Sequence, residues 1–273
     1  MRLVNYIPFP IRQIMSDMAA GTESTARTNP MLEFSAGSMP MIRKIVEAFG
    51  WLMMAVLIFT AVTSIFGRAD FLNEMAATEN PAEAANAFDI RYWEHSLATW
   101  THLIGGMLIM VIGPLQFLRP IRKNYTNFHR WSGRVFLLCG SMAALSGVFI
   151  GVFYPFAGLE AEGFNESMAT AYFGAYTLFC LIKAYTSVRA RDFGAHREWM
   201  IRSWALMLAI ATERVMLGIL MSNTNVGIEV LFGTTFWMAG VTNIAASEIW
   251  INLTRTPGNG ARHWKDVDAK AAA

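Results

Sequence analysis

Two histidines, His129 and His196, each begin a long apolar segment of the chain. Each is followed at once by an arginine and has a second arginine about a turn later, which gives Arg130, Arg134, Arg197 and Arg202. Two imidazoles at one depth on two helices can ligate the two faces of a b-type haem, and guanidinium groups suit its propionates. Gln116, at the end of another segment, reaches a similar depth. The same group could hold a quinone head group or a lipid phosphate, and simple anchoring at the membrane surface is the alternative.

A second polar group is expected near the opposite ends of the segments. His102 lies about five residues into its segment, and Glu213 and Arg214 lie about fifteen into theirs, so at about 1.5 Å per residue the depths coincide. A charge at that depth costs at least about 2.5 kcal/mol, so such residues normally pair or face a polar cavity. We expect His102 to pair with Glu213, because sequence neighbours such as Glu213 and Arg214 do not face each other on a helix. The group could bind a cofactor, relay protons or lock two helices together.

The elements that must hold these residues are apolar helices. The 273 residues are 54% hydrophobic and 15% charged, with a mean hydropathy of +0.35, whereas soluble domains are about 25% charged. A helix needs about 20 mainly apolar residues to cross a bilayer. Six stretches qualify, namely 48–66, 97–118, 133–154, 166–186, 199–221 and 228–251. The sequence therefore predicts an all-α polytopic transmembrane helical bundle of about six spans, with a single helix break at Gly113-Pro114.

Lysine and arginine are distributed unevenly between the predicted loops. They gather before the first span, between the second and third, between the fourth and fifth, and after the sixth, while the opposite loops carry mostly aspartate and glutamate. Since basic loops stay in the cytoplasm, both ends of the chain are expected inside. We interpret 1–44 as a mobile cytoplasmic tail, 45–253 as the six-helix transmembrane domain and 254–273 as a second cytoplasmic tail. The expected location is the inner (plasma) membrane, with the lipid bilayer as partner.

Several classes of function find no support in the sequence. Cys139 and Cys180 are the two cysteines, which excludes a disulfide framework and any Cys-based zinc or iron–sulfur site. No nucleotide-binding loop, HExxH pair or nucleophile motif is present, so soluble-type hydrolase or kinase chemistry has no support in the sequence. No catalytic residue is assigned, and no nucleic-acid partner is expected.

Three motifs carry a resemblance to a known family. GPLQF at 113–117, HRWSGR at 129–134 and HREWMIRSWAL at 196–206 resemble a family of predicted multipass membrane proteins, mainly bacterial and also fungal, described as a domain of unknown function. The resemblance covers roughly residues 95–220 and brings no established activity. Its pattern matches His102, Gln116, His129, Arg130, Gly133, Arg134, His196, Arg197, Arg202 and Arg214. Glu213 stands where the pattern has an apolar residue. A looser likeness to small b-type membrane cytochromes is one of architecture alone.

Three functions follow as hypotheses. The first is membrane electron transfer through a b-type haem or quinone bound by His102, His129 and His196, with a membrane redox partner. In that case His129 and His196 are the pair that could share one haem iron, because His102 lies at the other side. The second is a transporter or lipid-binding protein whose arginines recognise an anionic group. The third is a non-catalytic membrane subunit. We rank electron transfer first, and whether the protein is an enzyme stays open.

Overall fold

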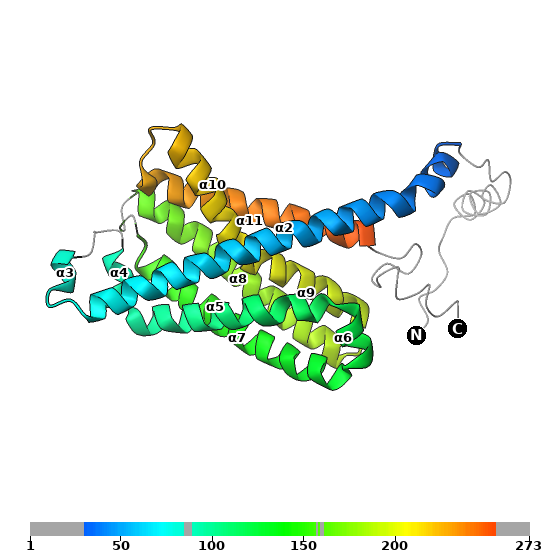
Figure 1. The fold of residues 1–273 in the computed structure, drawn as a ribbon, viewed down its shortest axis with the longest axis horizontal. Helices are drawn as coiled ribbons and strands as arrows, with labels where there is room; N and C mark the ends of the chain where they lie inside the picture. The colour runs from blue at the N-terminus through cyan, green and yellow to red at the C-terminus, as the bar shows by residue number, and fades with distance from the viewer. Residues whose placement is uncertain (1–29, 85–88, 157, 159–160, 255–273) are drawn as a thin grey trace, which may run out of the picture. The chain divides into compact units, whose positions relative to one another are not determined.

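The structure is a computed structural model, and it describes residues 30–84, 89–156, 158 and 161–254. Every regular element in these residues is an α-helix (Figure 1), which confirms the predicted all-α class. The helices are α2 (Pro30–Ala76), α3 (Pro81–Ala84), α4 (Ile90–Glu94), α5 (Ser96–Phe117), α6 (Arg119–Asn124), α7 (Thr126–Phe153), α8 (Ala161–Arg189), α9 (Phe193–Met207), α10 (Ala209–Asn223) and α11 (Ile228–Thr254).

The chain divides into two compact units, residues 1–48 and residues 49–273. Helix α2 begins in the first unit, so residues 30–44 of the predicted N-terminal tail are helical. Residues 1–29 of that tail, and residues 255–273 of the predicted C-terminal tail, lie outside the described residues.

The six segments that the sequence predicts to span a membrane all lie in helices. Five of them fall in α2, α5, α7, α8 and α11, and the segment 199–221 is divided between α9 and α10. Among the described residues, four stretches are long and apolar enough to cross a membrane: Lys44–Ala76, Ser96–Phe117, Thr126–Phe153 and Phe193–Asn223. The total of six spans and the orientation of the chain therefore stay predictions.

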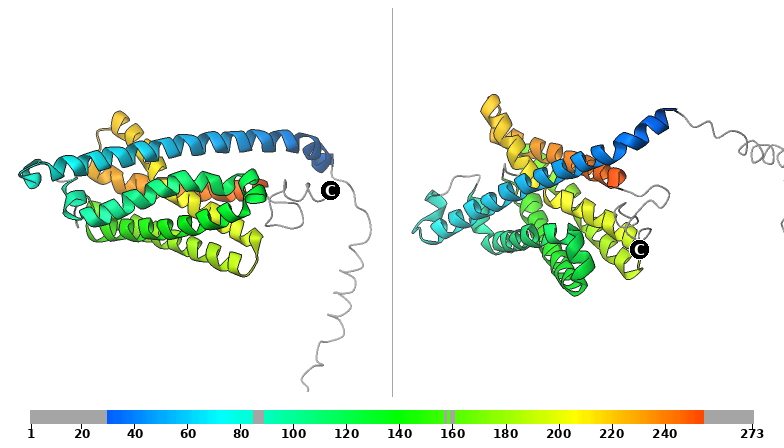
Figure 2. Two further views of the ribbon diagram at one scale, coloured as in Figure 1. Left: turned by 60° about the horizontal axis from the view of Figure 1, so that its bottom comes forward. Right: turned by 45° about the vertical axis from the view of Figure 1, so that its right-hand side comes forward.

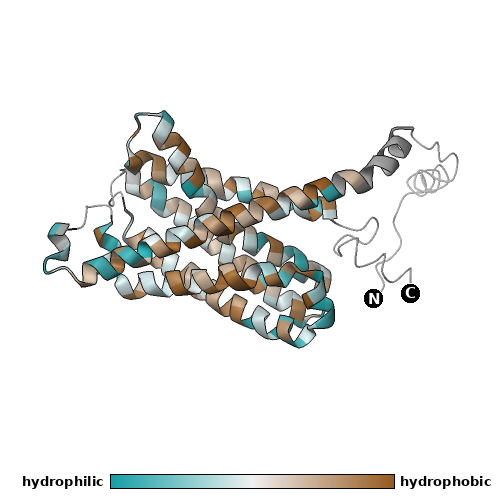
Figure 3. Ribbon diagram, viewed as in Figure 1, coloured by the Kyte–Doolittle hydropathy of each residue, from teal (hydrophilic) through white to brown (hydrophobic). Residues whose placement is uncertain are grey.

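Short connections make successive helices antiparallel neighbours. Helix α5 reaches α7 through the six residues of α6, and α5 and α7 run side by side (Figure 1, Figure 2). Figure 3 shows hydrophilic residues gathered at α3 and α4 and again at α6, with mainly hydrophobic helix between them. We call the α4 end the outer end and the α6 end the inner end, following the predicted orientation.

The main core lies between α5, α7, α8 and α9. Phe136 is fully buried there, with its ring centroid 6.0 Å from that of Trp204. The Trp204 ring lies over Gly113, where a Cβ atom would come within 2.2 Å of it, so α5 and α9 can approach only because this residue is glycine. Helix α5 continues through Pro114 to Phe117, so the predicted break at Gly113-Pro114 is wrong.

The helix break falls instead at Leu208, between α9 and α10. Asn243 of α11 faces it: its Nδ2 donates to the Ala205 carbonyl at 2.8 Å, and its Oδ1 accepts from the Thr212 hydroxyl at 3.0 Å. A side-chain donor inserted beside an i→i−4 ladder is an established cause of such interruptions. The break divides the fifth predicted span into an inner half, α9, and an outer half, α10.

Candidate functional site

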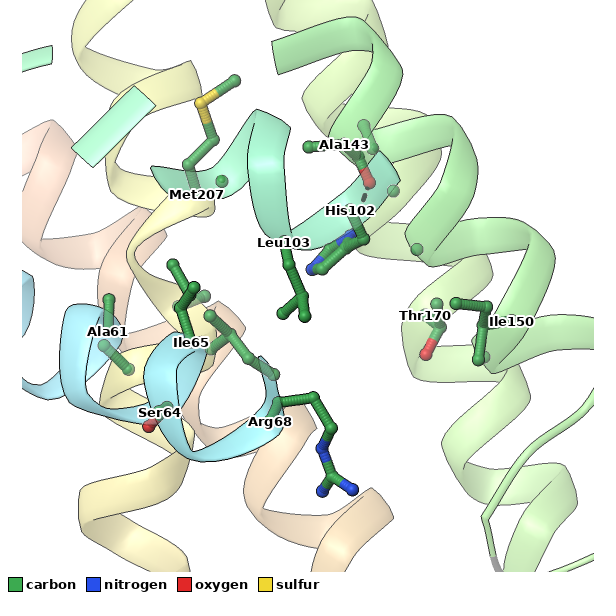
Figure 4. Close-up of a pocket in the computed structure, with 18 of the residues that line it drawn as sticks. Ala61, Ser64, Ile65, Arg68, His102, Leu103, Ala143, Ile150, Thr170 and Met207 are labelled. Atoms are coloured by element: carbon green, nitrogen blue, oxygen red, sulfur yellow. Dashed lines mark hydrogen bonds between the residues drawn. The ribbon is translucent and has the colours of Figure 1, made fainter. Parts of the chain in front are cut away.

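A cavity of about 560 Å³ lies in the outer half of the second unit, and we call it the outer pocket (Figure 4). Residues from α2, α5, α7, α8, α9, α10 and α11 form its largely apolar wall, and Asp89 and Tyr92, at and in α4, lie at its outer end. Its polar lining residues are Ser64, Arg68, Asp89, Tyr92, His102, Glu166, Thr170, Thr177 and Arg214. A mainly apolar cavity of several hundred Å³ with a few convergent polar groups is typical of a site for a small amphiphilic molecule.

His102 is held in one orientation in the wall of this pocket. Its Nδ1 atom lies 2.8 Å from the Ala143 carbonyl oxygen of α7, which Figure 4 shows as a dashed line. Because a carbonyl only accepts hydrogen bonds, Nδ1 must carry the proton, and Nε2 of the neutral ring is then an acceptor. The ring packs on Gly147, where a Cβ atom would come within 3.0 Å of the ring carbon Cε1.

An ion pair and a stacked aromatic ring close the outer end of the pocket. Arg68 of α2 donates to Asp89 at 2.7 Å, and its guanidinium carbon lies 3.6 Å from the centre of the Tyr92 ring. Tyr92 stacks on Phe156 with ring centroids 4.4 Å apart. Burial raises the pKa of the Tyr92 phenol, and the nearby guanidinium groups of Arg214 and Arg68 oppose that rise. The phenol therefore serves this end as a neutral hydrogen-bonding group.

Glu213 and Arg214 pair with each other, contrary to the sequence-based prediction. The Arg214 Nη1 atom lies 3.5 Å from Glu213 Oε2, and the fully buried Glu213 accepts a hydrogen bond from Thr235 through Oε1 at 3.2 Å. The predicted pairing of His102 with Glu213 is wrong, because His102 bonds to the α7 backbone. Arg214 nevertheless lines the same pocket as His102, so those two predicted residues do come together.

Glu166 is a pocket residue that the sequence reasoning missed. Its side chain is 1% exposed, and its Oε2 atom accepts from the Phe156 backbone N–H at 2.9 Å. Arg68, Asp89 and Tyr92 were missed as well, because they lie in what the sequence presents as an aqueous loop. Glu166 could have been singled out from the sequence, because it is an acidic residue at the first position of a predicted membrane span.

The residues predicted for the inner end form a second group, which we call the inner cluster: Gln116, His129, Arg130, Arg134, His196, Arg197 and Arg202. His129 and His196 are close enough to interact electrostatically. His196 Nδ1 lies 2.8 Å from the Ala184 carbonyl oxygen, so its Nε2 is an acceptor by the same argument as for His102. The buried Nδ1 of His129 has no hydrogen-bond partner among the described residues.

Several members of the inner cluster brace helices. Arg202 donates to both carboxylate oxygens of Glu248, at 2.6 and 3.0 Å, and lies 3.6 Å from Glu198. Arg197 donates to the Thr254 hydroxyl, and buried Gln116 donates to Ser132 at 2.7 Å. These contacts tie α9 to α11 and α5 to α7. No group of three or more histidine, cysteine or acidic side chains suited to a metal ion occurs in the described part of the chain.

Arg130 and Arg134 are exposed at the start of α7. The Arg134 guanidinium carbon lies 4.6 Å from the centre of the exposed Trp131 ring. Gln116 follows His102 by fourteen residues on α5, which places the inner cluster about 21 Å along the helix from the outer pocket. The structure thus separates the predicted site residues into two groups, as their estimated depths indicated.

Comparison with known proteins identifies the family. Residues 99–251 match the family described as predicted membrane protein (DUF2306), which is more than half of the chain. No curated protein and no solved structure matches the chain. The matched region includes α7, α9, α10 and most of α5, and with them His102 and every predicted member of the inner cluster. The chain is thus a membrane protein that belongs to the predicted membrane protein (DUF2306) family.

Proposed function

We propose that the protein takes part in membrane electron transfer and binds a quinone in the outer pocket. One observation carries the proposal: an imidazole acceptor, His102 Nε2, is presented by a cavity of about 560 Å³ whose wall is otherwise largely apolar. A quinone has an apolar ring and tail and a head group that hydrogen-bonds through its oxygens. Its reduced form, the quinol, carries two hydroxyl groups, and each can donate a hydrogen bond to the unprotonated nitrogen of a neutral imidazole.

The charges around the pocket favour a neutral head group over an anion. Arg68 is matched by Asp89 at 2.7 Å, and Arg214 is matched by Glu213 at 3.5 Å. An anionic ligand would have to compete with these carboxylates for the two guanidinium groups, and Glu166 adds a further acid to the lining. This electrostatic balance supports a quinone rather than the anionic group expected for a transporter or lipid-binding protein.

The chemistry assigned to the pocket is the exchange of protons with a bound quinol. Oxidation of a quinol to a quinone breaks two O–H bonds and releases two protons and two electrons. His102 Nε2 is the base that accepts the first proton, and its orientation is fixed by the Ala143 carbonyl. The two electrons pass one at a time to a one-electron acceptor, which is reoxidised before it takes the second.

We further propose that a b-type haem held by His129 and His196 at the inner end is that acceptor. His196 has its Nε2 lone pair available, and His129 lies within electrostatic range of it, with the guanidinium groups of Arg122 and Arg130 also near His129. Two neutral imidazoles with arginines nearby suit a haem and its propionates. A haem bound there supplies one-electron redox chemistry, and a redox partner at the inner face of the plasma membrane would complete the path.

The quinone is tested by binding to purified protein in lipid nanodiscs. Decylubiquinol, the reduced form whose hydroxyl can donate to His102 Nε2, is titrated under argon, and binding is followed by isothermal titration calorimetry. We expect His102→Leu to weaken binding about 10-fold, the loss of one hydrogen bond. His95→Leu is the matched control, since His95 packs on Phe149 and Tyr154 and does not line the pocket. No binding to the wild type, or equal binding by His102→Leu, would refute the quinone proposal.

The haem is tested separately by a reduced-minus-oxidised absorption spectrum after expression with ample haem. The wild type should show the Soret and α bands of a b-type cytochrome, and His129→Ala and His196→Ala should each lose them. His95→Ala should keep them. A wild-type protein without a Soret band would rule out the haem and leave the quinone proposal standing.

A further inference from the structure

Three polar residues of α8 form a line along the wall of the outer pocket. Glu166, Thr170 and Thr177 all line the cavity, and their spacings of four and seven residues place them on one face of the helix. Glu166 is at the outer end of this line, and Thr170 follows one turn deeper. The line offers hydroxyl and carboxyl groups on the α8 side of a largely apolar wall.

Helix α7 places His102 next to this line. The His102 ring packs on Gly147, where a Cβ atom would come within 3.0 Å of it, and Thr170 packs on Gly151, where a Cβ atom would come within 2.8 Å. Gly147 and Gly151 are one turn apart, so His102 and Thr170 are separated by about 6 Å along α7. Glu166 is about 6 Å further along α8. A proton relay along these residues therefore needs water between them.

We propose that Glu166 accepts the proton that His102 takes from a bound quinol and passes it to the outer surface. The inference rests on the proposed quinone site. The first quinol O–H bond breaks and its proton moves to His102 Nε2, then through the Thr170 hydroxyl and water to a Glu166 carboxylate oxygen. The second O–H bond breaks next, and its proton follows once Glu166 has released the first. The two electrons are taken one at a time by a one-electron acceptor that is reoxidised between them, or in the test by two ferricyanide ions, so the products are a quinone, two protons and two equivalents of reduced acceptor.

Glu166 suits this role better than the other acids near the pocket. Glu213 does not line the cavity, and Asp89 forms an ion pair with Arg68 at the outer end. The Phe156 backbone N–H donates to Glu166 Oε2 at 2.9 Å and fixes the carboxylate in place. A carboxylate has about four lone-pair sites, so it can accept a proton while that bond persists. The titratable and charged groups that face it across the cavity are Arg68, Asp89, Tyr92, His102 and Arg214.

The test compares quinol oxidation with quinone binding in the same nanodisc preparations. Protein is loaded with decylubiquinol, unbound quinol is removed, and one turnover is started with ferricyanide, which takes one electron per ion. We expect Glu166→Gln to slow the turnover about 100-fold, the contribution of a general acid or base. Glu166→Asp should stay within about 10-fold of the wild type because it keeps a carboxylate. Decylubiquinone affinity should be unchanged in both variants.

Glu94→Gln is the matched control, because Glu94 is exposed and lies outside the pocket lining. Its turnover should equal that of the wild type. A Glu166→Gln variant that oxidises quinol at the wild-type rate overturns the proposal, whereas a wild type that binds no quinone overturns the proposed function itself.

A second measurement uses the wild type alone, in case Glu166→Gln does not fold. Rapid infrared difference spectra during the turnover should show a transient carboxylic-acid carbonyl band that shifts in D₂O. The absence of that band would also overturn the role of Glu166, because a purely structural carboxylate stays ionised throughout.

Discussion

The outer pocket and the inner cluster use the same residue types in opposite ways. At the inner end, Arg202, Arg197 and Gln116 are hydrogen-bonded directly to side chains of neighbouring helices. At the outer end, His102, Glu166 and Arg214 surround a cavity of about 560 Å³. Polar residues that close on one another stabilise a bundle, whereas polar residues arranged around a void can recognise a ligand. The difference lies in packing and not in residue type.

The contacts of most inner residues therefore suit a role in stability, whereas the cavity at the outer end suits the binding that we propose. The exceptions at the inner end are His129 and His196. The buried Nδ1 of His129 has no hydrogen-bond partner in the described part of the chain, and His196 has its Nε2 lone pair available. Because of these two residues, the proposed function includes a haem at the inner end. Variants at each end, each with a matched control, distinguish the roles of the two regions.

The largest effect is expected from Arg202→Met at the inner end. Arg202 bridges Glu248 at 2.6 Å and Glu198 at 3.6 Å, so its removal leaves two carboxylates close together without their shared cation. We expect the free energy of unfolding to fall by about 3 kcal/mol. Thermal unfolding in detergent measures the change. Arg134→Met is the control, because the exposed Arg134 should contribute less than about 0.5 kcal/mol. Equal losses in both variants would mean that Arg202 is not a brace.

A smaller loss is expected at the helix break between the two regions. Asn243→Leu removes the donor to the Ala205 carbonyl and the acceptor for Thr212. Two buried polar groups then lose a partner, and the free energy of unfolding should fall by about 2 kcal/mol. Asn252→Leu on the same helix is the control, since the exposed Asn252 donates to the Glu248 carbonyl of its own turn. Unchanged stability in Asn243→Leu would contradict the role given to this side chain.

Gly147→Ala should lower the affinity for the quinol more than it lowers the stability of the fold. The new Cβ atom would lie 3.0 Å from His102 Cε1 and push the imidazole from its position. We expect decylubiquinol affinity to fall about 5-fold, or about 1 kcal/mol, while any haem bands at the inner end stay unchanged. Gly218→Ala, with nothing within 4 Å of the added carbon, should bind like the wild type. A loss of haem bands in Gly147→Ala would show that the two ends are coupled.

The smallest effect is expected from the ion pair at the outer end. The side chains of Arg68 and Asp89 are 21% and 24% exposed, so their attraction is partly screened by solvent. Arg68→Leu should lower the free energy of unfolding by about 0.5 kcal/mol, and the difference from the wild type should shrink as salt is raised. Thermal unfolding at two salt concentrations measures both. A loss several times larger that salt does not change would show that this pair is buried in the membrane.

The helical class and the separation into two depths could be predicted from the sequence, because hydropathy and helical rise depend only on the order of residues. The hydrogen-bond and ion-pair partners of these residues could not be predicted. His102 bonds to a backbone carbonyl of α7, which leaves no trace in residue type. Arg214 Nη1 lies 3.5 Å from Glu213 Oε2, a contact between neighbouring positions that their Cβ directions alone do not indicate.

The pocket could not be predicted from the sequence for a different reason. Asp89 and Tyr92 lie in or beside the short helix α4, in a stretch that hydropathy presents as an aqueous loop, and Arg68 lies in an extension of α2 beyond its predicted span. The break at Leu208 was equally hidden, because neither proline nor glycine marks it and its partner, Asn243, lies on α11. Such features depend on tertiary contacts between distant residues, so a single sequence read along its length does not contain them.

The central claim is that the quinone binds in the outer pocket and not elsewhere on the apolar surface. The most direct test is photolabelling in nanodiscs with an azido-substituted quinone, followed by mass spectrometric mapping of the labelled peptides. We predict labels on pocket residues of α5, α7, α8 and α10 that disappear with excess decylubiquinone. Labels at the α6–α7 turn, or labels scattered over lipid-exposed positions and unaffected by decylubiquinone, would contradict the claim.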